Sequence, residues 1–208
     1  MTDHPARGRF NAWFLDLLDG YMHRKCGALK RGLFGALPAS VVEIGAGAGA
    51  NLRYYPRGTR VIAVEPNVRM HHRLTRNALA RGIDLDLRTT PGESLDLPDA
   101  SVDLVCTTLT LCTVDDPAAV VAEARRVLRP GGRFVCLEHV AAPPGSRIAS
   151  LQRAIKSPWR WVFEGCDLCR DTETTLRRAG FREIQIERIE VPTIFLPLRH
   201  QIAATCIA

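Results

Sequence analysis

The chain has 208 residues, of which 46% are hydrophobic and 24% are charged, a composition typical of one globular domain with a full hydrophobic core. The net charge is +6, but the basic residues form no dense run and only 6% of residues are aromatic, which argues against a nucleic-acid substrate. No apolar run reaches the roughly 20 residues of a membrane span and no signal-peptide pattern is present, so we expect a cytoplasmic protein.

The N-terminal part carries apolar residues at helical spacing over Arg9–Leu37, which predicts an amphipathic helix. Gly20, Gly27 and Gly32 are expected to weaken or break this helix. An amphipathic helix of this kind is expected to pack on the domain as a cap. Tyr21 and His23 are the polar candidates for substrate contact if the segment covers a ligand site instead.

An apolar run at Val41–Ile44 is followed by Gly45, Gly47 and Gly49 at alternate positions. The run predicts a buried strand, and the glycines predict a tight turn after it. Glycine has no Cβ, so the backbone can turn sharply and a ligand can approach it closely. A helix is expected to follow, with its free N–H groups directed at the same place. This arrangement suits a nucleotide-like ligand at the carboxyl edge of a parallel sheet.

Glu65 follows the next predicted strand, Arg60–Val64, at the distance where dinucleotide-binding sheets carry a ribose-binding carboxylate. A helix is expected over Asn67–Arg81, with the asparagine as its N-cap, and Ile83–Arg88 alternates like a third strand. Gly45–Ala50 also fits the dinucleotide pattern G-x-G-x-x-G/A. These residues alone therefore leave a nicotinamide cofactor open.

The rest of the chain continues to alternate between strand and helix patterns. Further strands are expected at 102–107, 133–138, 183–191 and 201–207, and further helices from Asp116-Pro117 to Arg129–Gly132 and at 172–179.

Five short motifs occur in a fixed order along this frame. They are Val41–Gly49, Val64–Asn67, Pro91–Leu95, Ser101–Val105 and Val127–Gly132. The ordered set resembles class I S-adenosylmethionine-dependent methyltransferases, over roughly residues 40–140. The resemblance implies an α/β fold with a doubly wound, Rossmann-like sheet of seven mostly parallel strands and an antiparallel last strand. It also implies one domain over 1–208, with 1–40 as an N-terminal helical cap and 140–170 as an insertion that faces the substrate.

The same resemblance implies a site for S-adenosylmethionine, which leaves as S-adenosylhomocysteine. The loop at Gly92-Glu93-Ser94 would hold the adenine, whose exocyclic amine needs an acceptor, and the end of the fourth strand would face the methionine part. The implied cofactor-binding residues are Glu43, Gly45, Ala46, Gly47, Asn51, Glu65, Pro66, Asn67, Met70, Gly92, Glu93, Ser94, Thr108 and Leu109.

A narrower resemblance spans about residues 42–207. Its motifs are Gly47–Asn51, Tyr55-Pro56, Glu65–Asn67, Leu109–Cys112, Glu138–Ala141, Pro158-Trp159, Gly165-Cys166 and His200. They are similar to methyltransferase-like enzymes that methylate alkyl thiols. Those enzymes carry an N-terminal membrane anchor, which is not apparent in this sequence, and an aspartate in place of Glu65.

The narrower resemblance implies methyl transfer to the sulfur of a small-molecule thiol. His139, at the end of the fifth strand, is the candidate to accept the proton or orient the thiol, and Asp167 is a second candidate. The long stretch from 139 to 170 is rich in aromatic residues, which suits an apolar wall for a small substrate or simply anchors the insertion. The expected substrate contacts are Tyr21, Cys112, Trp159 and Phe163.

Other functions remain open at this stage. A methyltransferase acting on oxygen, nitrogen or carbon of another small metabolite, such as a quinone-type ring, would have the same cofactor frame. A nicotinamide oxidoreductase or a non-catalytic binding module would leave Gly92-Glu93-Ser94 unexplained. The sequence gives no indication of the oligomeric state.

Seven cysteines without a signal peptide favour free thiols over a disulfide framework. Cys166 and Cys169 form a C-x-x-C pair, which is typical of a redox pair or, with further ligands, of a soft-metal or arsenical site. Because a zinc site needs four ligands and no second pair is evident, we expect no metal.

Overall fold

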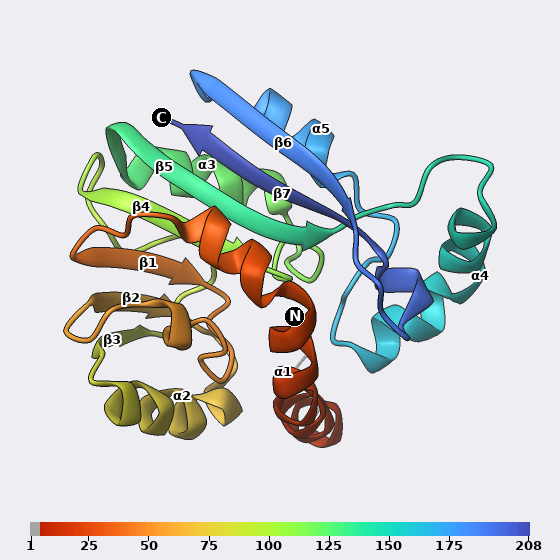
Figure 1. The fold of residues 1–208 in the computed structure, drawn as a ribbon, viewed down its shortest axis with the longest axis horizontal. Coiled ribbons are helices and arrows are strands. Elements are labelled where there is room, and N and C mark those ends of the chain that lie inside the picture. The colour runs from red at the N-terminus through yellow and green to blue at the C-terminus, as the bar shows by residue number, and fades with distance from the viewer. Residues whose placement is uncertain (1–4) are drawn as a thin grey trace.

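The computed structural model describes the backbone of residues 5–208 and the side chains from Gly20 onward, so the first four residues of the predicted 1–40 cap lie outside it. Seven strands form one sheet in the order β3-β2-β1-β4-β5-β7-β6 (Figure 1). β7 pairs antiparallel with both β5 and β6, and the other pairs are parallel. This confirms the predicted α/β sheet with an antiparallel last strand. The strands are β1 (Ser40–Ile44), β2 (Arg60–Val64), β3 (Asp84–Arg88), β4 (Val102–Thr108), β5 (Leu128–His139), β6 (Glu183–Glu190) and β7 (His200–Ile207).

Helices cover both faces of the sheet. α1 crosses the face nearer the viewer in Figure 1, in front of β4 and β5, and α3 and α5 lie on the other face. The helices are α1 (Pro5–Phe34), α2 (Val68–Arg81), α3 (Pro117–Val127), α4 (Arg147–Val162) and α5 (Thr172–Arg178), with short 3-10 turns η1 (Leu52–Tyr54) and η2 (Leu196–Leu198). Asn67 caps α2 as expected, since its side chain accepts a hydrogen bond from the backbone N–H of Arg69 at 3.1 Å.

α1 is one continuous helix, so Gly20, Gly27 and Gly32 do not break it. Each glycine inside a helix costs about 1 kcal/mol relative to alanine. Tertiary packing offsets this cost, because Cys26 and Phe34 are almost fully buried in clusters against the sheet. Among the described residues, no helix combines the length and the apolar character needed to cross a membrane.

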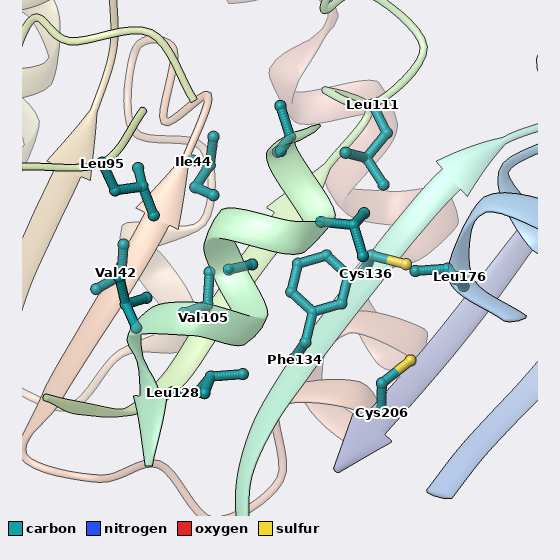
Figure 2. Packing of buried hydrophobic residues seen from close by; sticks show 14 of the residues in the cluster. Val42, Ile44, Leu95, Val105, Leu111, Leu128, Phe134, Cys136, Leu176 and Cys206 are labelled. Carbon is teal, nitrogen blue, oxygen red and sulfur yellow. The ribbon is translucent and has the colours of Figure 1, made fainter. Parts of the chain in front are cut away.

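The largest hydrophobic cluster lies between the sheet and the α3–α5 layer (Figure 2). Phe134 of β5 packs at its centre, next to Cys136 on the same strand, and Leu176 reaches it from α5. Burial of this apolar surface fixes the relative position of β1, β4 and β5. The carboxyl ends of those three strands therefore form a stable edge on which loops can carry function.

Two local predictions differ from the structure, and the structure adds one helix for which no prediction was made. The α-helix expected after the glycine turn is only the short turn η1, because Tyr55 precedes Pro56 and adopts an extended conformation. The helix expected to end at Arg129–Gly132 ends at Val127, and these four residues belong to β5, whose ladder is lengthened by hydrogen bonds of Gly131 and Gly132 to Ala208. The insertion after β5 contains the helix α4, which continues through Pro158.

Candidate active site

The glycine turn follows β1 at the carboxyl edge of the sheet, and its three glycines are required for different reasons. Gly45, Gly47 and Gly49 have φ angles of 72°, 56° and 86°, a region that side-chain-bearing residues rarely adopt. A Cβ on Gly45 would overlap the side chain of Thr110, and one on Gly49 would lie 2.7 Å from Leu52. A Cβ on Gly47 would have no non-adjacent heavy atom within 4 Å. Gly47 is thus the glycine that borders open space.

A buried acid holds the base of this turn. Glu43, at 1% exposure, accepts hydrogen bonds from the Asn51 amide and the Tyr55 hydroxyl, both at 2.8 Å. The Asn51 amide also donates to Thr108 Oγ1 at 2.8 Å, and its carbonyl oxygen accepts from Lys30 Nζ of α1 at 2.8 Å. Burial raises the pKa of Glu43. The network joins β1, the turn, β4 and α1. Glu43 and Asn51 therefore hold the glycine turn in place from its buried side.

Glu65 lies beside the glycine turn, as its position after β2 predicts. Its two carboxylate oxygens accept hydrogen bonds from the backbone N–H of Gly47 at 2.7 Å and of Asn67 at 2.9 Å. Burial raises its pKa, partly offset by these two donors. A carboxylate has about four acceptor sites. Glu65 therefore fixes the turn and keeps capacity for a ligand hydroxyl.

Replacing Glu65 with alanine should weaken binding of S-adenosylhomocysteine by about 1.5–3 kcal/mol, the range for hydrogen bonds to a charged group. The loss has two causes, since both the direct acceptor and the backbone anchor of Gly47 disappear. Isothermal titration calorimetry measures the effect. Glu187→Ala, an exposed acid on β6, is the matched control, and equal affinity in both variants would remove Glu65 from the site.

The predicted adenine loop follows β3. Adding a Cβ to Gly92 would bring it within 2.7 Å of Ile44 Cγ2, so the loop contacts the end of β1 closely. Glu93 is half-buried, and its carboxylate lies 3.4 Å from the backbone nitrogen of Asp116 at the start of α3. Ser94 closes a turn with Pro91. The structure thus brings this loop next to β1.

A second group of side chains gathers at the ends of β4 and β5. Cys112 follows β4, His139 ends β5, and Cys166 comes from the turn after α4. His139 Nε2 lies 3.1 Å from Cys166 Sγ, the sulfurs of Cys166 and Cys112 are 3.9 Å apart, and Trp159 Nε1–H donates to Cys166 Sγ at 3.3 Å. We call Cys112, His139 and Cys166 the thiol–imidazole cluster. All three side chains are buried.

The backbone after α4 brings Cys166 into the cluster. Glu164 and Gly165 have φ angles of 47° and 103°, and a Cβ on Gly165 would lie 3.1 Å from the carbonyl oxygen of Thr113. The backbone N–H of Asp167 donates to the carbonyl oxygen of Cys112 at 2.8 Å. This close approach explains why a glycine precedes Cys166.

Asp167 has structural partners on both carboxylate oxygens. One accepts from the backbone N–H of Cys169 at 2.9 Å, and the other pairs with Lys156 Nζ of α4 at 3.0 Å. Burial alone would raise its pKa, but these donors lower it. A carboxylate held in the ionised form by two donors is a weak proton acceptor, so this geometry favours a positioning role for Asp167.

Electrostatics in the cluster place a negative charge on Cys166. Hydrogen bonding with Cys112, His139 and Trp159 outweighs burial and lowers the pKa of Cys166 to about 4. Burial would lower the pKa of His139, but the Cys166 sulfur next to it gives a net increase. Both shifts favour a thiolate on Cys166 next to a protonated His139.

Alkylation by iodoacetamide should show this charge directly. Because only the thiolate reacts, an ordinary thiol loses about a hundredfold in rate from pH 8 to pH 6, whereas the low pKa of Cys166 keeps its rate nearly constant down to about pH 5. Mass spectrometry of chelator-treated protein, with free N-acetylcysteine as reference, measures both rates. A hundredfold decline at Cys166 would show that it is a neutral thiol.

Tyr21 and Phe163 belong to different surroundings. Phe163 packs on Trp159 with ring centroids 4.3 Å apart, at the edge of the thiol–imidazole cluster. The Tyr21 hydroxyl bonds with Thr193 Oγ1 at 3.3 Å and accepts from the backbone N–H of Ile194 at 3.0 Å. Those residues line a cavity of about 320 Å³ between α1 and the β6–β7 connection.

Sequence reasoning missed the pairing of Cys166 with Cys112 and paired it instead with Cys169. The structure joins Cys112 and Cys166 across 54 residues, while the Cys169 sulfur lies outside the cluster. The available signal was the glycine before Cys166, which marks a close backbone contact.

Comparison of the chain with known protein families and structures agrees with this geometry. Residues 42–136 match the family model described as a methyltransferase domain. Thiol S-methyltransferase TMT1B of Homo sapiens is 36% identical in an alignment 206 residues long. The match covers 93% of this chain and 84% of the relative. The chain belongs to the S-adenosylmethionine-dependent methyltransferases. Human thiol S-methyltransferase TMT1A is also 36% identical, over 74% of this chain and 64% of the relative.

The fold of this methyltransferase also matches solved structures. A SAM-dependent methyltransferase from Thermotoga maritima has a TM-score of 0.68 at 20% identity, and the match covers 96% of this chain and 97% of that one. The carboxyl edge fits the cofactor, because Gly47 borders open space and Glu65 lies beside it. When bound, S-adenosylmethionine supplies an electrophilic methyl group on a sulfonium sulfur.

Proposed function

We propose that this methyltransferase acts on the sulfur of a small-molecule thiol and produces a methyl thioether and S-adenosylhomocysteine. The observation that carries the proposal is the thiol–imidazole cluster at the carboxyl ends of β4 and β5, the same edge that carries the glycine turn. Similarity to thiol S-methyltransferases over 93% of the chain supports the choice of sulfur. The seven free cysteines suit a reducing compartment and hence the cytoplasm.

The proposed cofactor site consists of the glycine turn, the acid after β2, the loop after β3 and the end of β4. Its residues are Glu43, Gly45, Ala46, Gly47, Asn51, Glu65, Pro66, Asn67, Met70, Gly92, Glu93, Ser94, Thr108 and Leu109. Two members have room for a ligand by different means, since Gly47 borders open space and Glu65 has acceptor capacity to spare. Glu43 and Asn51 are buried, and the hydrogen bond between them supports the glycine turn.

The proposed acceptor site lies against the aromatic pair of α4. Trp159 and Phe163 supply an apolar wall, and Cys112 and His139 lie at its base. Tyr21 contributes by tying α1 to the β6–β7 connection over the sheet edge. In this proposal 1–208 is one domain, with 1–40 as the cap and 140–170 as the insertion that faces the substrate.

Methyl transfer is an in-line displacement. The acceptor sulfur loses its proton and uses a lone pair to form the new S–CH₃ bond, while the electron pair of the broken C–S bond stays on the leaving sulfur. The protein contributes mainly by holding the two sulfurs in line and excluding water. His139, whose protonated form is favoured next to Cys166, orients the acceptor sulfur, the proton of the thiol passes to solvent, and Asp167 positions the turn that carries Cys166.

A turnover assay tests the acceptor. The protein is incubated with S-adenosylmethionine and a matched panel of small thiols, phenols, amines and quinols, and release of S-adenosylhomocysteine is followed. We expect release with thiols alone, together with the methyl thioether. Turnover with an oxygen, nitrogen or carbon acceptor and none with thiols would contradict the proposal and favour the quinone-type alternative.

A further inference from the structure

The thiol–imidazole cluster has the dimensions of a metal site. One ligand atom each from Cys112, His139 and Cys166 lies within 4.8 Å of the others, and all three side chains are buried. Zn–S bonds of about 2.3 Å at tetrahedral angles separate two sulfurs by about 3.8 Å. The sulfurs of Cys112 and Cys166 are 3.9 Å apart. The His139 Nε2 to Cys166 Sγ distance of 3.1 Å needs to open by only about 0.5 Å to match a tetrahedral centre.

The other ring nitrogen of His139 bears on how a metal ligand would be held. His139 is 2% exposed, and its Nδ1 atom has no hydrogen-bond partner among the residues that the structure describes. A buried polar atom without a partner costs about 1–3 kcal/mol, so such an atom calls for an explanation. A metal held between the two sulfurs would bind Nε2, the nitrogen that faces Cys166, and would leave Nδ1 to a small polar partner such as a buried water.

We propose that Cys112, His139 and Cys166 bind a zinc-class divalent cation and that its open fourth position binds the acceptor thiol. The inference rests on the proposed thiol methylation and gives a physical role to all three side chains. Two sulfurs and one imidazole are ligands that zinc prefers, and three protein ligands with one open position are typical of catalytic zinc rather than structural zinc.

The remaining side chains nearby suit this role. Trp159 Nε1–H points at the Cys166 sulfur at 3.3 Å, the kind of outer hydrogen bond that fixes a metal ligand. Asp167 is held by Lys156 and the backbone of Cys169, so it anchors the turn and leaves the fourth position to the substrate. Among the described residues, only these three side chains form such a group.

A cation at this place changes the chemistry of the acceptor. A thiol that coordinates zinc is deprotonated, so the acceptor R–SH would bind as R–S⁻ and its proton would pass to solvent. The bound sulfur keeps a lone pair that forms the bond to the methyl carbon, and the neutral thioether product then leaves the cation. Thiols become better acceptors than alcohols or amines, because the two cysteine ligands favour a soft metal and hence a soft fourth ligand.

Metal binding can be measured without turnover. Purified protein is stripped with a chelator and titrated with Co²⁺ as a spectroscopic substitute for zinc, and zinc content is counted by mass spectrometry. We expect one equivalent per chain and a sulfur-to-cobalt charge-transfer band. Cys112→Ser and Cys166→Ser should lose the band, whereas Cys169→Ser, the matched control from the same C-x-x-C pair, should keep it. Absence of the band in the wild type, or its loss in Cys169→Ser, would overturn the proposal.

A milder variant protects the test against misfolding. Trp159→Phe keeps the packing on Phe163 but removes the N–H on the Cys166 sulfur, so cobalt affinity should fall by about tenfold. Binding of S-adenosylhomocysteine to each variant reports whether it is folded. The proposed metal site would also be contradicted if Trp159→Phe kept its cobalt affinity and Cys166→Ser kept the charge-transfer band.

The open position is tested separately by adding a small alkyl thiol, 2-mercaptoethanol, to the cobalt protein. We expect the charge-transfer band to intensify, and no change with the alcohol analogue ethylene glycol. An unchanged band with the thiol would overturn the substrate role. If the thiol binds cobalt but the turnover panel shows no thioether, the proposed function fails while the metal site stands. If thioether forms at full rate in metal-free protein, the proposed function stands and the proposed role of the metal is overturned.

Discussion

Replacing His139 with glutamine should lower kcat/KM for the thiol acceptor by about a hundredfold or more, within the range for loss of a positioned acid–base or ligand group. His139 is buried at the end of β5, 3.1 Å from the Cys166 sulfur, and the methyl-transfer geometry depends on that position. Affinity for S-adenosylhomocysteine should stay within about twofold, because the side chain of His139 bonds with Cys166 whereas the glycine turn is held by Glu65. Steady-state kinetics and calorimetry measure the two quantities. His72→Gln, on the exposed face of α2, is the control.

A purely structural role for His139 would give a different result. Loss of the imidazolium removes a partner that lowers the pKa of Cys166, so alkylation at pH 6 should slow in His139→Gln while the melting temperature reports folding independently. A variant that melts earlier, yet keeps its kcat per folded molecule and its Cys166 reactivity, would assign His139 to the core and remove it from the chemistry.

Much of the cofactor edge follows from local sequence. A short apolar run before alternate glycines is sufficient to predict β1 and its turn, because glycine is needed where φ is positive. Glu65 could be placed beside Gly47, since parallel strands end at the same edge of a sheet and the structure joins them at 2.7 Å. The prediction of an α-helix after the turn was wrong, because the extended conformation of Tyr55 before Pro56 ends the helix after one short turn.

The acceptor side was less predictable, since it depends on long-range packing. His139 could be singled out from its place at a strand end, but nothing local links Cys112 to Cys166. Their sulfurs meet only because α4 returns to the sheet and the turn at Gly165 fits against Thr113. The C-x-x-C spacing likewise does not reveal the partner of Cys166, because neighbours in sequence on a turn can point to different surroundings.

Replacing Gly47 with alanine should reduce affinity for S-adenosylhomocysteine by about ten- to a hundredfold, which corresponds to the 1–3 kcal/mol that an extra carbon costs in a filled site. In the protein alone, the new Cβ meets no non-adjacent atom within 4 Å, so the clash arises only with a bound ligand. The φ angle of 56° adds about 1–2 kcal/mol of backbone strain to the folded state. Calorimetry measures the affinity and denaturant unfolding measures the strain.

Gly58→Ala separates these two effects. Gly58 has a φ angle of 82° and, like Gly47, no non-adjacent heavy atom within 4 Å of an added Cβ, but it precedes β2 at the opposite edge of the sheet. It should lose similar stability and keep full cofactor affinity. Gly45→Ala should lose more stability than either variant, because its Cβ overlaps Thr110. If Gly47→Ala binds as tightly as Gly58→Ala, the space beside Gly47 does not hold the cofactor, and the site must lie elsewhere along the carboxyl edge.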